Sequence, residues 1–534
     1  MKFDDLIVNY LGEFGKYQKV QFLLVCLPTL FTAFHALSWT FSGATVPHRC
    51  VLPGETKTSP YWLPEQDQRV SVQKCDLSDH PDWKRCPYES CAYSNGTKCN
   101  NGFVYDNSVI KFSAMQRWDI VCDRSVLKAV IQSMYYVGQM AGSLVFGFLG
   151  DRIGRKKVFF IAINVLIVSG IGMVVAPHWI IFSLCRIAVG FSHPGIFVIA
   201  VVIGMELVGP SKRKVASIFT GIFFALGQMF LGITAYFIRD YQYLQLAISV
   251  PALVFLSYWW LIPESARWLV SQRRYEDADK VIRKAAKWNK TQVPEKWWEE
   301  VETDDTTLTK SETSKKKHNF FDLVRTPKLR RISLSIMLCW PIVSMVYYGV
   351  SMNTNFLGGN LYTTFIFGAL IEIPSVITVF FLIDRIGRRP LLSGGFTIAS
   401  ICMISNLLVG ANVHWLVSMV QFLLAKGAIT ATYASIYTFT PELFPTVIRN
   451  TAMGMCSMMA RVGAILASYI SMWLVDQFGK VAMIIPFATL GLLAAVIVLS
   501  LPETAGKELP ETIEQLEGHV KSHELQPLSS TKSE

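Results

Sequence analysis

The sequence has few charged residues for its length. Only 17% of its 534 residues are Asp, Glu, Lys or Arg, whereas 51% are hydrophobic and 34 are Phe. A soluble enzyme of this length would carry more charge, because its surface must be solvated by water. The composition therefore favours a chain that is solvated largely by lipid.

Sequence elements for catalysis and for nucleotide or metal binding are also missing. No His-Glu-x-x-His or Gly-x-Ser-x-Gly element occurs, so hydrolytic chemistry has no candidate residues. Residues 204–211 have the glycine spacing of a phosphate loop, but Pro210 replaces the lysine that reaches the phosphates. Cys86, Cys91 and Cys99 lack the paired Cys-x-x-Cys spacing of a zinc site. We expect no enzyme activity, no catalytic residue, no metal and no cofactor.

Three motifs that are present occur twice, in the same order. Residues 147–156 and 381–389 both contain Asp-Arg-Ile-Gly-Arg, and Asp384 stands 233 positions after Asp151. A Glu and an Arg seven residues apart recur at offset 236, and Pro263-Glu-Ser is echoed by Pro502-Glu-Thr at offset 239. Parallel repeats of this kind are typical of transporters built from two six-helix halves.

Twelve apolar stretches are long enough to cross a bilayer of about 30 Å. We expect an all-α membrane protein with twelve transmembrane helices in two pseudo-symmetric six-helix halves. The stretches lie near 20–43, 126–149, 158–176, 179–205, 215–237, 243–262, 332–352, 361–383, 390–410, 414–440, 452–474 and 481–501. The segments are then an N-terminus (1–19), a first helix (20–43), a large loop (44–125), helices two to six (126–262), a polar linker (263–331), a second half (332–501) and a tail (502–534).

Basic residues predict the orientation. They cluster in alternate loops, near 152–157, 212–214, 267–331 and 385–389, which places those loops and both termini in the cytosol of a plasma-membrane protein. The net charge of +11 therefore reflects topology. A nucleic-acid partner is not expected, because the basic residues are spread over successive loops instead of forming one stripe.

The large loop holds six of the eleven cysteines and an Asn-Gly-Thr acceptor for glycosylation at Asn95. An even number of cysteines in an oxidising compartment predicts three disulfides, whose pairing the sequence cannot choose. These residues are Cys50, Cys75, Cys86, Cys91, Cys99 and Cys122.

The repeated charged motifs suggest a cytosolic gate. Arginine and carboxylate side chains at helix ends can form interhelical ion pairs that hold the inner side closed and break when the halves move. The alternative is that these charges only set topology and cap helices. The gate candidates are Asp151, Arg152, Arg155, Glu206, Arg213, Arg267, Asp384, Arg385, Arg388, Glu442 and Arg449.

These motifs resemble the major facilitator superfamily. The sequences Pro-Glu-Ser-Ala-Arg-Trp-Leu at 263–269, Pro-Glu-Leu-Phe-Pro-Thr-Val-Ile-Arg-Asn at 441–450 and Leu-Gly-Glu-Phe-Gly at 11–15, with the long Cys-bearing loop, look like the organic cation, carnitine and organic anion transporters. The resemblance covers roughly 3–515. It implies twelve helices and alternating access. Arg186, with Gly190 four residues on, resembles an element linked with proton or conformational coupling. The alternative is that Arg186 is the partner of another buried acid.

Charges inside spans are costly and indicate function by default. Glu372, Lys426 and Arg461 could hold an amine at one end and a carboxylate at the other, or Glu372 and Lys426 could be a structural pair. By resemblance, cation carriers have an acid where Arg461 stands, whereas carnitine and anion carriers have a base. Anion carriers tend to have Asp where Glu372 stands. The combination resembles the carnitine-type branch, although Thr32 replaces an Asn associated with sodium coupling.

Aromatic residues in the spans are candidates for contact with an ammonium group, which the face of a ring attracts. Trp340 and Tyr347 are seven residues apart and so share one helical face. The other two aromatic candidates for substrate contact are Tyr437 and Phe224. His35 and His193 are better explained as interior histidines than as proton carriers.

We therefore expect an alternating-access transporter of small organic cations or zwitterions, such as carnitine, betaines or amine and β-amino-acid derivatives. An organic anion exchanger and a membrane sensor that binds without translocation are the alternatives. Sodium or proton coupling and the oligomeric state stay open. The partners are a small-molecule substrate and the lipid bilayer.

Overall fold

The computed structural model describes residues 3–62, 90–93, 96–299, 320–353, 360–408, 414–507, 510 and 512–517. Within these residues, eleven helical spans are long and apolar enough to cross a membrane. A twelfth long helix, α5 (Val126–Ile153), carries Gln132, Ser133 and Gln139 on its buried side and is less apolar for that reason. The prediction of an all-α membrane protein with twelve helices in two halves is confirmed.

Each half contains six spans, some of which are built from more than one helix. The first is built from α2 (Lys16–Leu37), α3 (Trp39–Ser42), α5, α6 (Arg155–Val175), α7 (Trp179–Leu207), α8 (Arg213–Phe237), α9 (Tyr241–Ser249) and α10 (Tyr258–Leu261). The second is built from α14 (Pro327–Met352), α15 (Leu361–Leu370), α16 (Glu372–Ile386), α17 (Arg388–Leu408), α18 (Trp415–Leu443), α19 (Arg449–Tyr469), α20 (Val475–Phe478) and α21 (Val481–Leu499).

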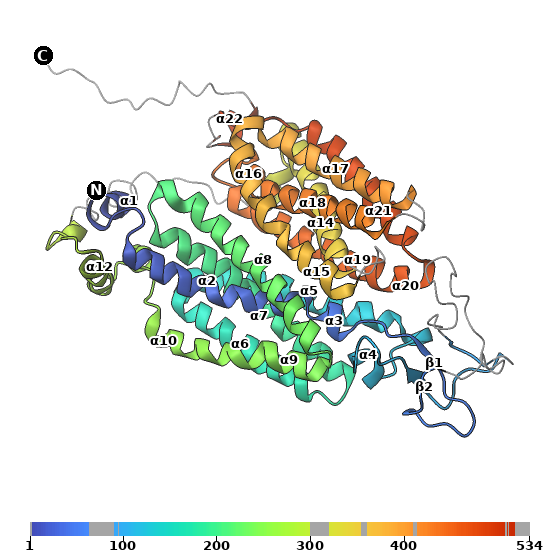
Figure 1. The fold of residues 1–534 in the computed structure, drawn as a ribbon. Coiled ribbons are helices and arrows are strands. Elements are labelled where there is room, and N and C mark those ends of the chain that lie inside the picture. The colour runs from blue at the N-terminus through green and yellow to red at the C-terminus, as the bar shows by residue number, and fades with distance from the viewer. Residues whose placement is uncertain are drawn as a thin grey trace, which may run out of the picture.

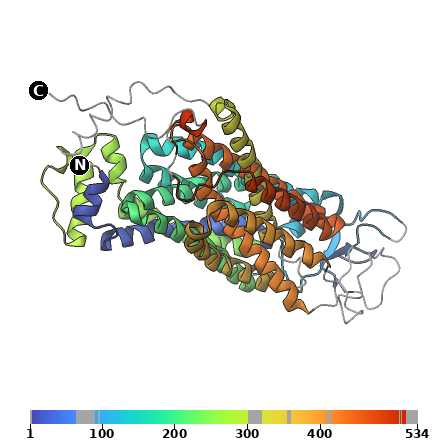
Figure 2. The same ribbon diagram turned by 90° about the horizontal axis from the view of Figure 1, so that it is seen from above.

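The halves meet at one end of the bundle and diverge toward the other (Figure 1). The end where they meet carries α3, α15 and α20 and the strands β1 (His48–Cys50) and β2 (Phe103–Tyr105), and we call it the loop side. The other end carries α1 (Phe3–Leu6), α12 (Tyr275–Asn289) and α22 (Ile513–Glu517), and we call it the termini side. Figure 2 shows the same bundle from above, with the first helix, in dark blue, at the end away from the strands.

A small cluster on the termini side belongs to the first half alone. The segment expected as a polar linker contains the helix α12, which packs with α1 and α11 (Ala266–Ser271). Leu6, Leu11, Trp268 and Ile282 are buried in this contact. The segment between the halves therefore begins as a folded element attached to the first half.

The last described helix belongs to the second half. The ammonium of Lys328 donates to the carbonyl oxygen of Leu516 at 2.5 Å, and the backbone N–H of Leu329 donates to Glu517 at 3.2 Å. Both acceptors are in α22 and both donors are at the start of α14. The two chain ends are thus fastened to different halves.

Two disulfides tie the large loop together. Cys50 is bonded to Cys99 and Cys91 to Cys122, so the loop is anchored near both of its ends. β1 and β2 pair antiparallel between these bonds. Cys75, Cys86 and the glycosylation acceptor Asn95 lie outside the described residues, so a third disulfide and glycosylation stay predictions.

The backbones of α5 and α7 approach closely through glycine. A Cβ on Gly190 would lie 1.9 Å from the carbonyl oxygen of Tyr135, and one on Gly138 would lie 2.0 Å from that of Ile187. No other residue fits such a contact without displacing backbone. The Gly190 of the Arg-x-x-x-Gly element therefore has a packing role of its own.

Candidate functional site

Glu372 and Lys426 form a buried ion pair in the second half. The Lys426 ammonium lies 2.7 Å from a Glu372 carboxylate oxygen, and the two residues are 4% and 1% exposed. Lys426 also donates to the Ser351 hydroxyl and lies 3.8 Å from the centre of the Tyr347 ring. Both charges are compensated, as removal from water requires. The structure thus brings together the pair that the sequence offered as one alternative.

The carboxylate of Glu372 also joins the two halves. The Tyr347 hydroxyl donates to it at 2.9 Å, and the amide of Gln228 in α8 donates to it at 2.9 Å. The same amide lies 3.2 Å from the Tyr347 hydroxyl. Gln228 belongs to the first half, so this buried network crosses the interface between the halves.

Aromatic rings from α14 and α18 extend this network. Tyr347 is stacked on Tyr433 at 5.2 Å between ring centroids, and Trp340 meets Tyr437 edge-on at 4.6 Å. Trp340 is fully buried and its indole N–H donates to Thr440, whereas Tyr437 is 41% exposed. Tyr437 is therefore the most exposed ring of this cluster.

Phe224, the fourth predicted aromatic contact, is in the first half. It lies 6.1 Å from the ring of His193, which accepts or donates a hydrogen bond at 2.8 Å with the Tyr135 hydroxyl. His193 is hence a hydrogen-bonded interior histidine, as the sequence indicated. Tyr136 connects the two groups of rings, because it lies 5.1 Å from Tyr348 in the second half.

Arg461 is a buried cation without a counter-ion among the described residues. It is 8% exposed, and its guanidinium donates to the backbone carbonyl and hydroxyl of Ser457 at 2.9 and 2.8 Å. Its Nε is buried and has no hydrogen-bond partner in this part of the chain. A guanidinium held this way favours a carboxylate ligand, which it can bind through two parallel hydrogen bonds.

Arg186 in α7 is surrounded by dipoles. It donates to the carbonyl oxygen of His35 at 2.9 Å, to the Ser38 hydroxyl at 3.3 Å and to the Gln132 amide oxygen. The Tyr135 ring lies 5.1 Å from its guanidinium. It forms no ion pair with any described residue, so the alternative of a buried acid as its partner finds no support there.

The first copy of the repeated motif connects α5, α6 and α7 on the termini side. Arg155 lies 2.9 Å from Asp151 and 3.3 Å from Glu206, and it donates to the carbonyl oxygen of Gly150 at 2.6 Å. Glu264 accepts the backbone N–H of Lys156 at 3.0 Å, at the start of α6. The motif therefore fastens three consecutive helices of one half.

The second copy repeats this arrangement. Arg388 lies 2.9 Å from Asp384 and 3.0 Å from Glu442, and Glu503 accepts backbone N–H groups of Arg388 and Arg389 at 3.0 Å each. Burial alone would raise the pKa of Glu503, but four backbone N–H donors lower it below its usual value. Two of these donors, Arg388 and Arg389, begin α17, and the other two are Thr504 and Ala505.

The other predicted gate residues have different partners. Arg213 donates to Asp4 at 2.6 Å, and Arg267 also pairs with Asp4, so α1 bridges them. Arg449 donates to the backbone of Phe444 at 3.3 Å. Arg152 and Arg385 are exposed at the helix ends. In the described part of the chain, none of the predicted gate residues pairs across the halves, so a gate between halves stays a prediction.

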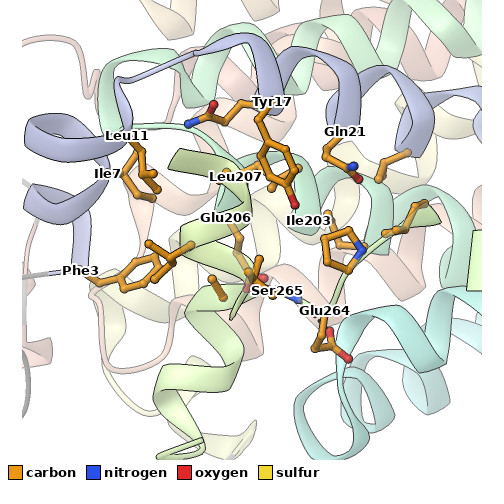
Figure 3. Close-up of a pocket in the computed structure, with 18 residues that line it drawn as sticks. Phe3, Ile7, Leu11, Tyr17, Gln21, Ile203, Glu206, Leu207, Glu264 and Ser265 are labelled. Carbon is orange, nitrogen blue, oxygen red and sulfur yellow. Dashed lines mark hydrogen bonds between the residues drawn. The ribbon is translucent and has the colours of Figure 1, made fainter. Parts of the chain in front are cut away.

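A cavity of about 40 Å³ on the termini side is lined by residues of α1, α2, α7 and α11, among them Glu206 (Figure 3). Tyr17, Gln21 and Glu206 line it, and one oxygen of each is buried without a partner among the described residues. A cavity of this size has room for water, which would satisfy such groups. The cavity lies next to the Arg155–Glu206 pair, because Glu206 belongs to both.

Sequence reasoning missed several partners. Gln228 and Asp4 gave no signal, because neither lies in a repeated motif. Glu264 and Glu503 belong to the third repeat, and their matching offsets could have indicated a shared helix-capping role. The ion pair of Lys128 and Asp476 on the loop side was also missed, since both lie at the edges of apolar stretches.

Comparisons with known proteins agree with this architecture. The family described as Sugar (and other) transporter matches residues 87–516. The Organic cation transporter protein of Drosophila melanogaster is 39% identical over 98% of this chain and 95% of its own length. Organic cation/carnitine transporter 2 of Mus musculus is 31% identical over 96% of this chain and 93% of its own.

The solved structures show the fold alone. The inward open conformation of the xylose transporter XylE from E. coli matches with a TM-score of 0.64 at 17% identity, covering 95% of this chain and all of that one. The chain is therefore a membrane transporter, not an enzyme, and belongs to the organic cation, carnitine and organic anion transporter family, solute carrier family 22, of the major facilitator superfamily.

Proposed function

We propose that the chain transports small organic zwitterions, such as carnitine and betaines, with simple organic cations as weaker substrates. The observation that carries this proposal is the charge balance of the interior. Glu372 is neutralised by Lys426, whereas Arg461 has no counter-ion among the described residues. A purely cationic solute would meet a net positive site, so a carboxylate on the solute is favoured.

The aromatic rings supply the other pole. Tyr437 is partly exposed and packs against Trp340, and such rings attract quaternary ammonium groups through their negative faces. A zwitterion could place its carboxylate at Arg461 and its ammonium at these rings. The names of the relatives, which include organic cation and carnitine transporters, agree with this class of solute.

We place the protein in the plasma membrane with the termini side in the cytosol. The basic residues of the motif loops lie on that side and support the orientation. The disulfide-bonded loop would then face the oxidising exterior. Because the halves diverge toward the termini side, we interpret this conformation as open to the cytosol.

The test is uptake of labelled carnitine, choline and an aryl carboxylate by cells that express the chain, with and without external sodium. Carnitine and choline share a trimethylammonium group, so their comparison isolates the carboxylate. We expect carnitine to accumulate fastest. Equal uptake of both would remove the zwitterion preference, and sodium dependence would define the coupling that Thr32 leaves open.

The second candidate is an organic anion exchanger, and the unpaired Arg461 is the observation that favours it. Preferential uptake of the aryl carboxylate, with export of an internal anion, would establish it. A sensor would bind these solutes without accumulating them. Uptake into sealed vesicles distinguishes a transporter from a sensor, because only transport concentrates the labelled solute inside the vesicles.

A further inference from the structure

A second cavity, of about 350 Å³, lies on the loop side between the two halves. Trp39, Thr45 and Lys128 line it from the first half, and Met352 and Asp476 line it from the second. This volume falls within the range of small-molecule sites, which begins at about 300 Å³. None of the predicted substrate-binding or gate residues lines this cavity.

An ion pair between the halves crosses this cavity. The Lys128 ammonium lies 3.2 Å from Oδ2 of Asp476, and the Thr45 hydroxyl lies 2.6 Å from Lys128 and 3.1 Å from Asp476. Every other ion pair between described residues joins groups of the same half or of its loops. The Lys128–Asp476 pair therefore adds a charge attraction to the other contacts between the halves on the loop side, such as the stacking of Phe41 on Tyr362.

The pair leaves bonding capacity toward the cavity. An ammonium has three N–H donors, and Lys128 uses two of them, on Thr45 and Asp476. Lys480 also lines the cavity and is exposed, with no ion-pair partner in the described part of the chain. Two lysines against one carboxylate give the cavity a surplus positive charge, so an anionic group is the ligand that it favours.

Lys128 itself is mostly withdrawn from water. Its side chain is 11% exposed, against 30% for that of Asp476. A solute carboxylate that reaches Lys128 would replace Asp476 without leaving the ammonium uncompensated. The exchange would cost little for Lys128 while removing an attraction between the halves.

We propose that this cavity is a loop-side subsite for the carboxylate group of a solute, in which the solute competes with Asp476 for Lys128. Occupation would break the link between the halves and favour opening of the loop side. The inference rests on the proposed function, because it assumes that the halves rock around a central site. It adds a step that selects carboxylate-bearing solutes before they reach Arg461.

The two partners of the pair should have opposite effects on affinity. Lys128→Gln removes the cation that binds the carboxylate, so we expect the KM for carnitine to rise about tenfold with choline unchanged. Asp476→Asn removes the competitor, so we expect the KM for carnitine to fall several-fold. Lys111→Gln, at an exposed loop lysine outside the cavity, is the matched control.

A binding measurement makes the test independent of transport. We would follow the Tm of the purified full chain as carnitine or choline is added, for the wild type and all three variants. The carnitine concentration that gives half of the maximal rise in Tm should be higher for Lys128→Gln and lower for Asp476→Asn than for the wild type. If both variants shift every solute in the same direction, the pair is only a mechanical link and the subsite is refuted.

Failure of the proposed function gives a different pattern. Absence of carnitine accumulation by the wild type would refute transport of zwitterions. If carnitine still raised the Tm with opposite midpoint shifts in the two variants, the subsite would stand as a binding site alone. Accumulation by the wild type with parallel changes in both variants would instead refute the subsite alone.

Discussion

Lys426 of α18 and Glu372 of α16 face each other at 2.7 Å, and the Tyr347 ring covers the ammonium at 3.8 Å. The pair places one charge of each sign in a region from which water is largely excluded. Its net charge is zero, so the charge of the site is determined by Arg461. Substitution of each residue in turn separates the role of Arg461 from that of the Glu372–Lys426 pair.

Arg461→Ala should weaken solutes that carry a carboxylate more than simple cations. Loss of two charge-assisted hydrogen bonds predicts a rise of about tenfold or more in the KM for carnitine, with less than about twofold for choline. Initial rates of uptake, corrected for surface expression, measure both. Arg461→Lys keeps the charge without the planar fork and should give an intermediate KM. Equal losses for both solutes would contradict direct contact.

Glu372→Gln should destabilise the protein, because it leaves the Lys426 ammonium buried without a counter-ion. Breaking a buried pair from one side costs about 3–5 kcal/mol, whereas removing both charges costs far less. We expect a lower Tm for the single variant and recovery of most of it in Glu372→Gln/Lys426→Met. A single variant as stable as the wild type would show that the pair is dispensable.

The same double variant also reports on transport. If Glu372 binds the ammonium group of the solute, choline uptake should fall strongly even though the Tm is restored. Retention of both choline and carnitine uptake would leave the pair with a structural role alone. Uptake by the double variant is divided by its surface expression before it is compared with uptake by the wild type.

Gly154→Ala should lower the Tm, because Gly154 has φ of +105° and an added Cβ would lie 2.3 Å from Glu264. That backbone region is almost confined to glycine and costs other residues about 1–3 kcal/mol. Gly387→Ala should behave alike, since φ is +100° and Glu503 lies at 2.9 Å. Gly147→Ala is the matched control, with no atom within 4 Å of its Cβ. Equal Tm values for the three variants would contradict a requirement for glycine at positions 154 and 387.

Glu503→Gln should destabilise the second half in a pH-dependent way. Backbone N–H donors, from Ala505 and Thr504 and from the start of α17, lower the pKa of Glu503. Its contribution is therefore complete above the unfolded pKa of about 4.5 and is lost as pH falls through the lower folded value. We expect a loss of about 1 kcal/mol at pH 7. The Tm difference from the wild type should shrink as pH approaches 4.

The control for this measurement is Glu276→Gln, at an exposed position of α12. Its Tm difference from the wild type should be small at every pH. A difference for Glu503→Gln that stays constant from pH 7 to 4 would mean that the carboxylate charge is not what stabilises α17.

The sequence predicted the architecture because its signals are local or repeated. Apolar runs identify spans wherever they are long enough, and the echoes of Asp151, Arg155 and Glu206 in the second half required a duplicated helix contact. The interhelical pairs Arg155–Glu206 and Arg388–Glu442 then follow from equal spacing. The spacing did not predict that both partners of each pair belong to the same half, because it says nothing about which half supplies a partner.

The candidate site was predictable only in part. Glu372, Lys426 and Arg461 were identifiable as costly intramembrane charges, but their pairing depends on the rotation of α16, α18 and α19 about their axes. Gln228 completes the network as a neutral residue, which carries no such signal. Asp4 lies in a short helix at the chain start, and its contact with Arg213 and Arg267 depends on how α1 docks.

The attachment of the two chain ends to opposite halves has a practical consequence. Asp4 fastens α1 to the first half, and Glu517 fastens α22 to the second. Fluorophores placed at Asp5 and Lys507 would therefore ride on separate rigid bodies, and energy transfer between them would report their separation directly. A single such molecule could be watched through successive transport cycles without labelling the membrane helices.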